Sequence, residues 1–228
     1  MRAGGLGGLV VDDSGGGIAG ATVTVSGTTV GGDGASGTAT AGPDGAWAVG
    51  NLPAGTYTVS VRQPAGYGNG PDTPGAAGGR ASAPNRITGI DLAPGETAAG
   101  YRFTGTLGAI AGRVTVGGAI GLAEVEVGLT GTATSGESVV QTTATGPDGA
   151  FRFEGLPAGR YRVTETQPQD YASTDATTGT AGGYVATTDV LAGIALDAGE
   201  SARGYEFEEA QVRPGSDRQA SVRDRPGA

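Results

Sequence analysis

The stretch Gly146–Tyr161, which reads GPDGAFRFEGLPAGRY, recurs in the same chain as GPDGAWAVGNLPAGTY over Gly42–Tyr57. Matches at the same spacing continue toward the C-terminus. The chain therefore holds two copies of one unit, and a unit of about 100 residues has the size of a whole domain rather than of a solenoid repeat. We predict a first domain over 4–105 and a second over 106–207. The remaining 208–228, rich in Arg, Gly, Pro, Ser and Asp, are predicted to be a disordered tail or linker.

Apolar and polar residues alternate within each unit, as in ATVTV over Ala21–Val25 and YTVSV over Tyr57–Val61. A period of two is typical of strands with one buried face, and Gly, Pro, Asp and Asn interrupt it at short intervals. The sequence thus predicts an all-β fold: two tandem seven-stranded antiparallel Greek-key β-sandwiches. In the first unit the seven strands are expected at 6–12, 21–27, 36–41, 45–50, 55–62, 85–92 and 97–103, with equivalents in the second.

The two sandwiches are expected to be joined end to end, because the connection between them is short. The last strand of the first unit is predicted to end near Phe103, and the first strand of the second to begin near Leu107. The three residues Thr104–Thr106 between them reach only about 10 Å. A connection of that length does not allow the domains to fold back face to face.

The motif Pro43-Asp44-Gly45 places Pro at the second position of a turn and Gly where φ can be positive, which predicts a tight hairpin. Trp47 follows this turn and could be a stacking platform for a sugar or a nucleobase. Its counterpart in the second unit is Phe151, however, and a β-sandwich needs a large apolar side chain in its core. The pattern therefore favours a core position for Trp47.

The composition excludes several kinds of chemistry. The chain has no Cys and no His, and its fourteen basic residues are all Arg. Zinc sites built on Cys or His, Ser-His-Asp triads, Schiff-base lysines and the Walker phosphate loop are therefore absent from the sequence. A formal net charge of −9 argues against nucleic acid and anionic membranes as partners. We expect no enzymatic activity.

No run of 18 apolar residues occurs, and no apolar segment follows Met1. As written, the sequence predicts neither a transmembrane helix nor a signal peptide, and no membrane insertion. The segment 208–228 also contains no sorting motif of the LPxTG kind and no hydrophobic anchor.

Three blocks of the second unit carry a resemblance to a known family: Gly108–Gly112, Asp148–Tyr161 and Val163–Pro168. They resemble the SdrD B-like and collagen-adhesin B-like (Cna B-type) repeat domains of Gram-positive surface proteins. Those domains are related to carboxypeptidase regulatory-like and prealbumin-like sandwiches. The resemblance implies an Ig-like or prealbumin-like sandwich, an extracellular or cell-surface location, and a structural or adhesive role.

Some collagen-adhesin B-like domains carry an isopeptide bond between a Lys of the first strand and an Asn or Asp of the last, assisted by a buried Glu of the fifth strand. The resemblance places Glu165 where that Glu would stand, and Val61 is its counterpart in the first unit. Without any Lys the bond cannot form. We therefore expect Glu165 to be an exposed strand carboxylate, and the intact mass to equal the plain sequence mass.

SdrD B-like repeats also typically have an acidic calcium loop after the first strand. Asp12 and Asp13, followed by Ser14, resemble the first half of that loop, whereas the second half is missing. Calcium takes six to eight oxygen ligands, which these residues cannot supply alone. We expect no cofactor, with calcium at Asp12 and Asp13 as the candidate metal site and a Gly-rich turn as the alternative.

Two functions follow from these observations. The first is a non-enzymatic structural spacer, or stalk, of a bacterial extracellular or cell-surface multi-repeat protein, of which we expect this chain to be a fragment. The alternative is a β-sandwich that binds carbohydrate or a surface-protein partner through the loops 65–84 and 169–186. Those loops contain Tyr67, Tyr171 and Tyr184 as possible contact residues. Other cell-surface or matrix proteins, or glycans, are the partners expected for a monomeric chain of this kind.

Overall fold

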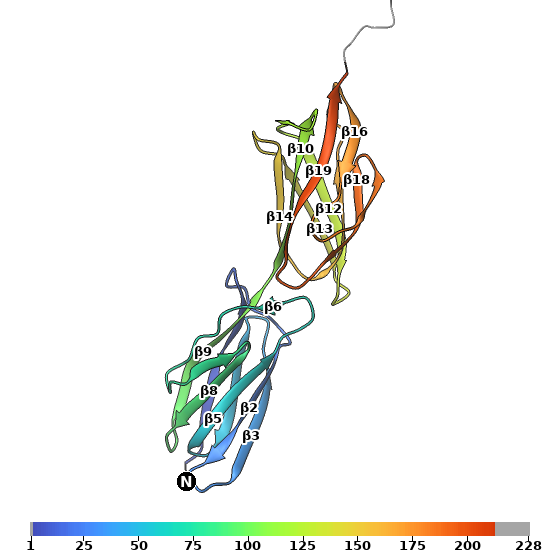
Figure 1. Cartoon of the computed structure of the whole chain (residues 1–228). Helices are drawn as coiled ribbons and strands as arrows, with labels where there is room; N and C mark the ends of the chain where they lie inside the picture. The colour runs from blue at the N-terminus through green and yellow to red at the C-terminus, as the bar shows by residue number, and fades with distance from the viewer. Residues whose placement is uncertain (1, 213–228) are drawn as a thin grey trace, which may run out of the picture.

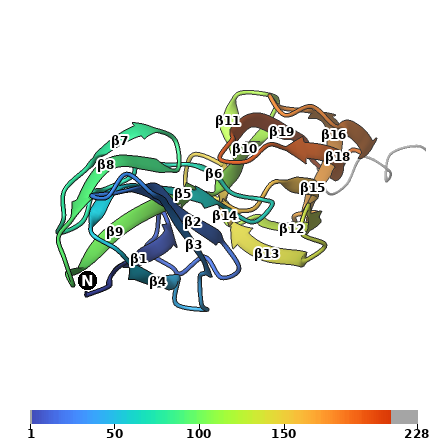
Figure 2. The same cartoon turned by 90° about the horizontal axis from the view of Figure 1, so that it is seen from below.

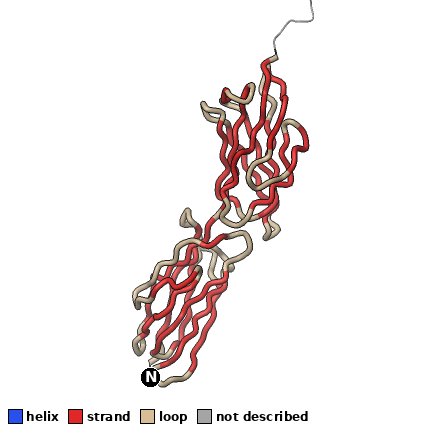
Figure 3. The backbone as a smooth tube through the Cα atoms, in the orientation of Figure 1, coloured by secondary structure: helices blue, strands red, loops and turns tan. Residues whose placement is uncertain are grey.

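The computed structural model describes residues 2–212, and its regular elements are β-strands joined by loops and turns (Figure 3). The strands form two sandwiches, each a pair of facing sheets, that follow one another along the long axis of the molecule (Figure 1). In a second view, β1–β9 and β10–β19 again occupy separate halves (Figure 2). The predicted all-β, end-to-end architecture is confirmed. The described part of the chain contains no helix that could span a membrane.

The first sandwich has one sheet with the strand order β4-β1-β9-β6 and one with the order β3-β2-β5-β8-β7. Alternate residues of β2 and β5, such as Val23 and Tyr57, point between the sheets and are buried. The strands are β1 (Gly4–Asp12), β2 (Thr22–Thr29), β3 (Gly34–Thr40), β4 (Ala46–Leu52), β5 (Gly55–Arg62), β6 (Gly68–Asn69), β7 (Arg80–Ala83), β8 (Arg86–Leu92) and β9 (Thr97–Thr106).

The second sandwich repeats this arrangement. One sheet has the order β11-β10-β19-β16, with β14 also paired to β10, and the other has the order β13-β12-β15-β18-β17. The strands are β10 (Gly108–Val116), β11 (Ile120–Gly121), β12 (Glu126–Ala133), β13 (Ser138–Ala144), β14 (Ala150–Leu156), β15 (Gly159–Glu165), β16 (Tyr171–Thr177), β17 (Tyr184–Thr187), β18 (Val190–Leu196) and β19 (Ser201–Gln211).

The seven predicted strands are all present in the first sandwich, but the count of seven is wrong. The structure adds the short strands β6 and β7 there, and β11, β16 and β17 in the second sandwich. The residues of β7 and β17 are all exposed, so these strands have no apolar alternation from which to predict them. Much of 169–186, predicted as a loop, is the sheet strand β16 followed by β17.

The sandwiches are also not purely antiparallel. β1 pairs with β9 in parallel, and β10 pairs with β19 in parallel. Alternation shows which face of a strand is buried but not the direction of its partner, and strands this far apart in the sequence need no hairpin between them. The prediction of antiparallel sheets is therefore corrected at one strand pair in each sandwich.

The predicted tight turn is confirmed, whereas the hairpin is not. The N–H of Gly45 donates to the carbonyl of Gly42 at 2.9 Å, and Gly45 has a φ of 77°. A Cβ at Gly45 would lie 2.0 Å from the carbonyl oxygen of Val10, so the turn requires glycine. The turn joins β3 to β4, which lie in different sheets. It carries the chain across the sandwich rather than back along the same sheet.

Trp47 is a core residue, as predicted. It is 5% exposed, and its ring lies 6.5 Å from that of Tyr101 and 6.4 Å from that of Phe103. Phe151 has the equivalent place, 6.2 Å from Phe207. Aromatic pairs at such distances add to the free energy gained from burial alone, so each sandwich has an aromatic cluster at its centre.

The strands at the junction are longer than predicted. β9 continues to Thr106 and β10 begins at Gly108, so only Leu107 separates them. The predicted three-residue linker, Thr104–Thr106, is instead part of β9, where Thr104 pairs with Val11 of β1. At the other end, 208–211 of the predicted tail belong to β19, and 213–228 lie outside the described residues.

Candidate functional site

The first predicted site, Asp12 and Asp13, forms a turn at the end of β1. Asp12 Oδ1 accepts hydrogen bonds from the Ser14 N–H at 2.9 Å, the Ser14 hydroxyl at 2.6 Å and the Gly16 N–H at 2.8 Å. Burial raises the pKa of Asp12, but these hydrogen bonds outweigh it and lower the pKa below its ordinary value. Three donors thus already stabilise this carboxylate, and a metal site at Asp12 and Asp13 stays a prediction.

The three predicted contact tyrosines lie on separate segments. Tyr67 precedes β6 and packs partly buried against the first core, where burial, then Asp12 and Glu137, raise its pKa. Tyr171 is the half-buried first residue of β16. Tyr184 is the first residue of β17 and is 62% exposed. Of the three, only Tyr184 presents most of its ring to solvent.

A cluster of three acids lies in the second sandwich: Glu165 and Glu209 are buried, and Asp189 is half-buried. Glu165 ends β15, Asp189 immediately precedes β18, and Glu209 lies near the end of β19. Each offers a carboxylate oxygen, and these oxygens all lie within 4.8 Å of one another. Among residues 2–212 this is the one group of three acids close enough to share an ion.

The expectation that Glu165 is exposed is wrong, because the side chain is only 3% exposed. Residues two apart on a strand share a face, so Glu165 lies on the same inward face of β15 as Tyr161 and Val163. The alternation in the sequence already contained this signal. The absence of Lys excludes the isopeptide bond, but it does not decide whether the carboxylate is buried.

The carboxylates of the cluster are only partly satisfied. The Gln167 amide donates from Nε2 to Glu209 Oε2 at 2.7 Å, and the Ser173 hydroxyl lies within hydrogen-bond distance of Asp189 Oδ1 and Gln167 Oε1. Both oxygens of Glu165 and Oε1 of Glu209 have no hydrogen-bond partner in the described chain. Burial, then Glu209 and Asp189, raise the pKa of Glu165 to about 8.

The aligned positions in the first sandwich carry no acid, but the carboxylate of Asp72 lies beside Asn85. The Arg86 N–H donates to Asp72 Oδ2 at 3.1 Å, Asp72 Oδ1 has no hydrogen-bond partner among the described residues, and burial raises the pKa of Asp72. The repeat spacing aligns Glu165, Asp189 and Glu209 with Val61, Asn85 and Gly105. The backbone agrees, because the Val61 N–H donates to the Asn85 carbonyl at 2.9 Å and the Glu165 N–H donates to the Asp189 carbonyl at the same distance.

In place of acids, the first sandwich has an amide network. The Gln63 amide donates from Nε2 to Asn85 Oδ1 at 2.9 Å and to the Thr104 carbonyl at 3.2 Å. The Asn85 amide in turn donates from Nδ2 to Asn69 Oδ1 at 2.5 Å. Neutral amides can be buried without the electrostatic cost of a carboxylate cluster, although Gln63 Oε1 has no hydrogen-bond partner among the described residues.

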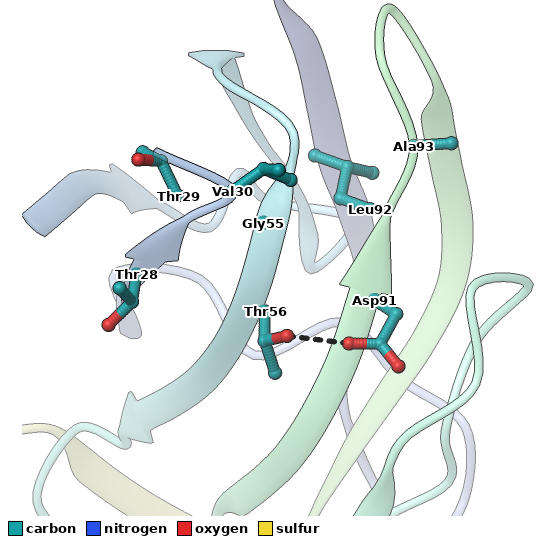
Figure 4. Close-up of a pocket in the computed structure, with 8 residues that line it drawn as sticks. All are labelled: Thr28, Thr29, Val30, Gly55, Thr56, Asp91, Leu92 and Ala93. Atoms are coloured by element: carbon teal, nitrogen blue, oxygen red, sulfur yellow. Dashed lines mark hydrogen bonds between the residues drawn. The ribbon is translucent and has the colours of Figure 1, made fainter. Parts of the chain in front are cut away.

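A surface hollow of about 290 Å³ lies in the first sandwich between the end of β2, the start of β5 and the end of β8 (Figure 4). Its polar groups are threonine hydroxyls and one carboxylate, and the Thr56 hydroxyl donates to Asp91 Oδ1 at 2.7 Å. This hydroxyl–carboxylate pair is exposed on the surface, and we assign no chemistry to the hollow.

Together, the sheets, the parallel pair of first and last strands, and the end-to-end repeat define tandem Ig-like β-sandwich domains. The second sandwich matches the SdrD B-like domain model over residues 114–202. The first matches the carboxypeptidase regulatory-like domain model over residues 5–99. The resemblance stated from the sequence is confirmed, because each sandwich matches the model of one of the domain families that the resemblance named.

Several solved structures match this chain at low identity and low TM-score. The Bacillus anthracis TIE protein is 20% identical with a TM-score of 0.46 and is matched over 93% of this chain and 34% of its own. A streptococcal ancillary pilin is 18% identical, with a TM-score of 0.35 and coverage of 94% and 64%. The major pilin T-13 of Streptococcus pyogenes is 11% identical, with a TM-score of 0.47 and coverage of 92% and 97%.

The chain therefore spans about a third of the Bacillus anthracis protein and less than two thirds of the ancillary pilin. No curated protein gives a significant sequence match.

Proposed function

We propose that the chain is a non-enzymatic structural module, a spacer or stalk, of a bacterial extracellular or cell-surface multi-repeat protein. The observation that carries this proposal is the junction between the two sandwiches. The last strand of the first leads into the first strand of the second with only Leu107 between them. A spacer must keep its domains apart and aligned, and so short a connection does so.

Contacts on both sides of Leu107 add to the stiffness of the junction. The N–H of Ala158 in the second sandwich donates to the carbonyl of Gly66 in the first at 2.9 Å. A Cβ at Gly68 would lie 2.8 Å from the Ala198 carbonyl oxygen, so the start of β6 approaches the second sandwich closely. Hinge motion at the junction must break this hydrogen bond and separate these surfaces.

The strand order suits a module that carries tension. β1 and β9 are parallel neighbours, so the N-terminal end of β1 and the C-terminal end of β9 lie at opposite ends of the first sandwich. β10 and β19 repeat this geometry in the second. A pull on the two chain ends slides such strands along each other, which loads their hydrogen bonds together instead of one at a time.

Single-molecule pulling tests this proposal, and the chain suits it because it has no native Cys. With handles at Arg2→Cys and Val212→Cys, we expect two unfolding events at high force. The control places handles at Thr22→Cys and Thr40→Cys, which face each other across β2 and β3, so that the same first sandwich is peeled open. Peeling is expected at a clearly lower force. Equal forces for the two geometries would contradict a tension-bearing role.

One observation favours the alternative, a ligand-binding sandwich. Tyr184 and Val185 lie next to each other on the edge strand β17 and are 62% and 44% exposed. An exposed aromatic on a strand edge can stack on a sugar or contact a partner protein. A pull-down with cell-wall glycans and matrix proteins tests this function. Loss of binding in Tyr184→Ala but not in the partly buried Tyr171→Ala would support it, and an absence of binding would remove it.

A further inference from the structure

We propose that Glu165, Asp189 and Glu209 form a binding site, inside the second sandwich, for a divalent cation that prefers oxygen ligands. Calcium and magnesium are the common cations of this class. The site is separate from the Asp12–Asp13 turn of the first sandwich, and it holds whether or not the chain is a spacer.

The first argument is burial without partners. Glu165 is 3% exposed and Glu209 is 1% exposed. Three of their four carboxylate oxygens, both of Glu165 and Oε1 of Glu209, have no hydrogen-bond partner among the described residues. Buried polar atoms are almost always paired in folded proteins, and an unpaired buried carboxylate is costly. Unpaired oxygens within a cluster of acids indicate a missing positive group.

The second argument is charge. No side chain in residues 2–212 supplies that positive group, because the two ion pairs found there, Arg113–Asp148 and Arg152–Glu154, are both on the surface. The buried acids instead face one another, and like charges at this spacing disfavour ionisation. This repulsion contributes to the raised pKa of Glu165. A bound cation would turn the repulsion into attraction.

The third argument is geometry. Calcium holds its oxygen ligands at about 2.3–2.6 Å, so oxygens on opposite sides of the ion are about 4.6–5.2 Å apart and adjacent ones are closer. Carboxylate oxygens from all three acids lie within 4.8 Å of one another. The acids come from three strand ends of a rigid sandwich, which fixes the spacing.

The donor set identifies the class of cation. All three side chains offer carboxylate oxygens, and neither nitrogen nor sulfur ligands are available in a chain without His or Cys. Such a set suits calcium, magnesium or manganese rather than zinc or copper. Gln167 and Ser173 orient the carboxylates of Glu209 and Asp189 from the outer side, as hydrogen-bonding neighbours of metal ligands do.

The experiment uses the full chain after treatment with a chelator and its removal. Isothermal titration calorimetry with calcium chloride, and separately with magnesium chloride, is expected to give one site per chain for at least one ion. Thermal unfolding should shift upward by several degrees in millimolar amounts of that ion, because the ion binds only the folded state. Glu165→Gln and Glu209→Gln should each weaken binding at least tenfold.

Two further variants make the outcome decisive. Asp12→Asn combined with Asp13→Asn removes the other candidate site, and Glu126→Gln removes an exposed acid of β12. Both are expected to bind the ion as the unchanged chain does. The glutamine variants keep the shape of Glu165 and Glu209 and remove buried repulsion, so they should fold.

Three results would overturn the proposal. The first is no binding of either ion at 10 mM, roughly the upper end of the affinity range of extracellular calcium modules. The second is binding that is lost in the Asp12–Asp13 double variant and retained in Glu165→Gln. The third is higher stability of Glu165→Gln at neutral pH, with no effect of either ion on the unchanged chain. That result would show that the acids share a proton instead of binding an ion.

Discussion

The two sandwiches share the same backbone arrangement but have different side chains at one equivalent internal place. In the first, Val61, Asn85 and Gly105 lie beside an amide network and a single carboxylate, Asp72. In the second, the same positions are Glu165, Asp189 and Glu209, with raised pKa at Glu165 and unpaired oxygens. The first sandwich shows that this fold does not need acids at these three positions. Their presence in the second, where they cost stability, is therefore better explained by a ligand than by folding.

The largest effect is expected from moving one acid into the equivalent place of the first sandwich. Val61→Glu would bury a carboxylate at a position that is 8% exposed, with no positive partner described nearby. An uncompensated buried charge costs about 3–5 kcal/mol, so the first sandwich should lose that much free energy of unfolding at pH 7. Urea unfolding measures it.

Val61→Leu is the matched control and should change the free energy of unfolding by less than about 1.5 kcal/mol. If Val61→Glu were as well tolerated as Val61→Leu, the two interiors would not differ in their tolerance of a buried charge.

The second expected effect is a pH dependence that is larger in the second sandwich than in the first, where burial also raises the pKa of Asp72. The pKa of Glu165 is raised from 4.5 to about 8 in the folded state, so the folded chain binds more protons than the unfolded chain between these values. In chelator, the stability of the second sandwich should be highest below pH 4.5 and fall as pH rises toward 8. With each pKa unit equivalent to about 1.4 kcal/mol, the fall amounts to a few kcal/mol.

Glu165→Gln should remove most of this slope and leave the first sandwich unchanged. Thermal unfolding from pH 4 to pH 9 measures both. A slope that persists in Glu165→Gln would show that other groups carry the pH dependence.

A smaller effect should be equal in the two sandwiches. The Tyr57 hydroxyl donates to the Pro53 carbonyl at 2.6 Å, and the Tyr161 hydroxyl donates to the Pro157 carbonyl at 2.6 Å. Tyr57→Phe and Tyr161→Phe should each cost about 1 kcal/mol, the usual net value of one hydrogen bond. Unequal losses of free energy in urea unfolding would mean that these two tyrosine hydrogen bonds, like the acid site, differ between the sandwiches.

The smallest effect is a gain in stability. Glu124 has a φ of 61° in the turn before β12, and its counterpart Gly20 has a φ of 78°. Glycine takes positive φ without the steric cost that a Cβ brings. Glu124→Gly should therefore stabilise the second sandwich by about 0.5–1 kcal/mol, and Gly20→Ala should destabilise the first. A loss of stability in Glu124→Gly would contradict the strain at this turn.

Local patterns predicted most of the fold. Alternation located the seven main strands, and Pro43 with Gly45 located the turn, because both signals depend on neighbouring residues. The parallel pairing of β1 with β9 was not predictable in this way, since it joins opposite ends of a domain. The all-exposed strands β7 and β17 gave no alternation at all.

The acid cluster was missed for a similar reason. Glu165, Asp189 and Glu209 lie on three segments that are separated in the sequence and meet only in the folded sandwich. Each alone is an ordinary acid in a chain of net charge −9. Only Glu165 carried a usable signal, its phase with Tyr161 and Val163 on β15.

The end-to-end arrangement is the central claim, and small-angle X-ray scattering tests it most directly. A compact chain of this length has a radius of gyration of about 17 Å. Two sandwiches of about 13 Å each, with centres roughly one strand length or about 35 Å apart, give about 22 Å or more. We expect the larger value. Insertion of a flexible Gly-Ser segment after Leu107 should broaden the distribution of interatomic distances. A radius close to 17 Å would contradict the aligned junction and the role as a spacer.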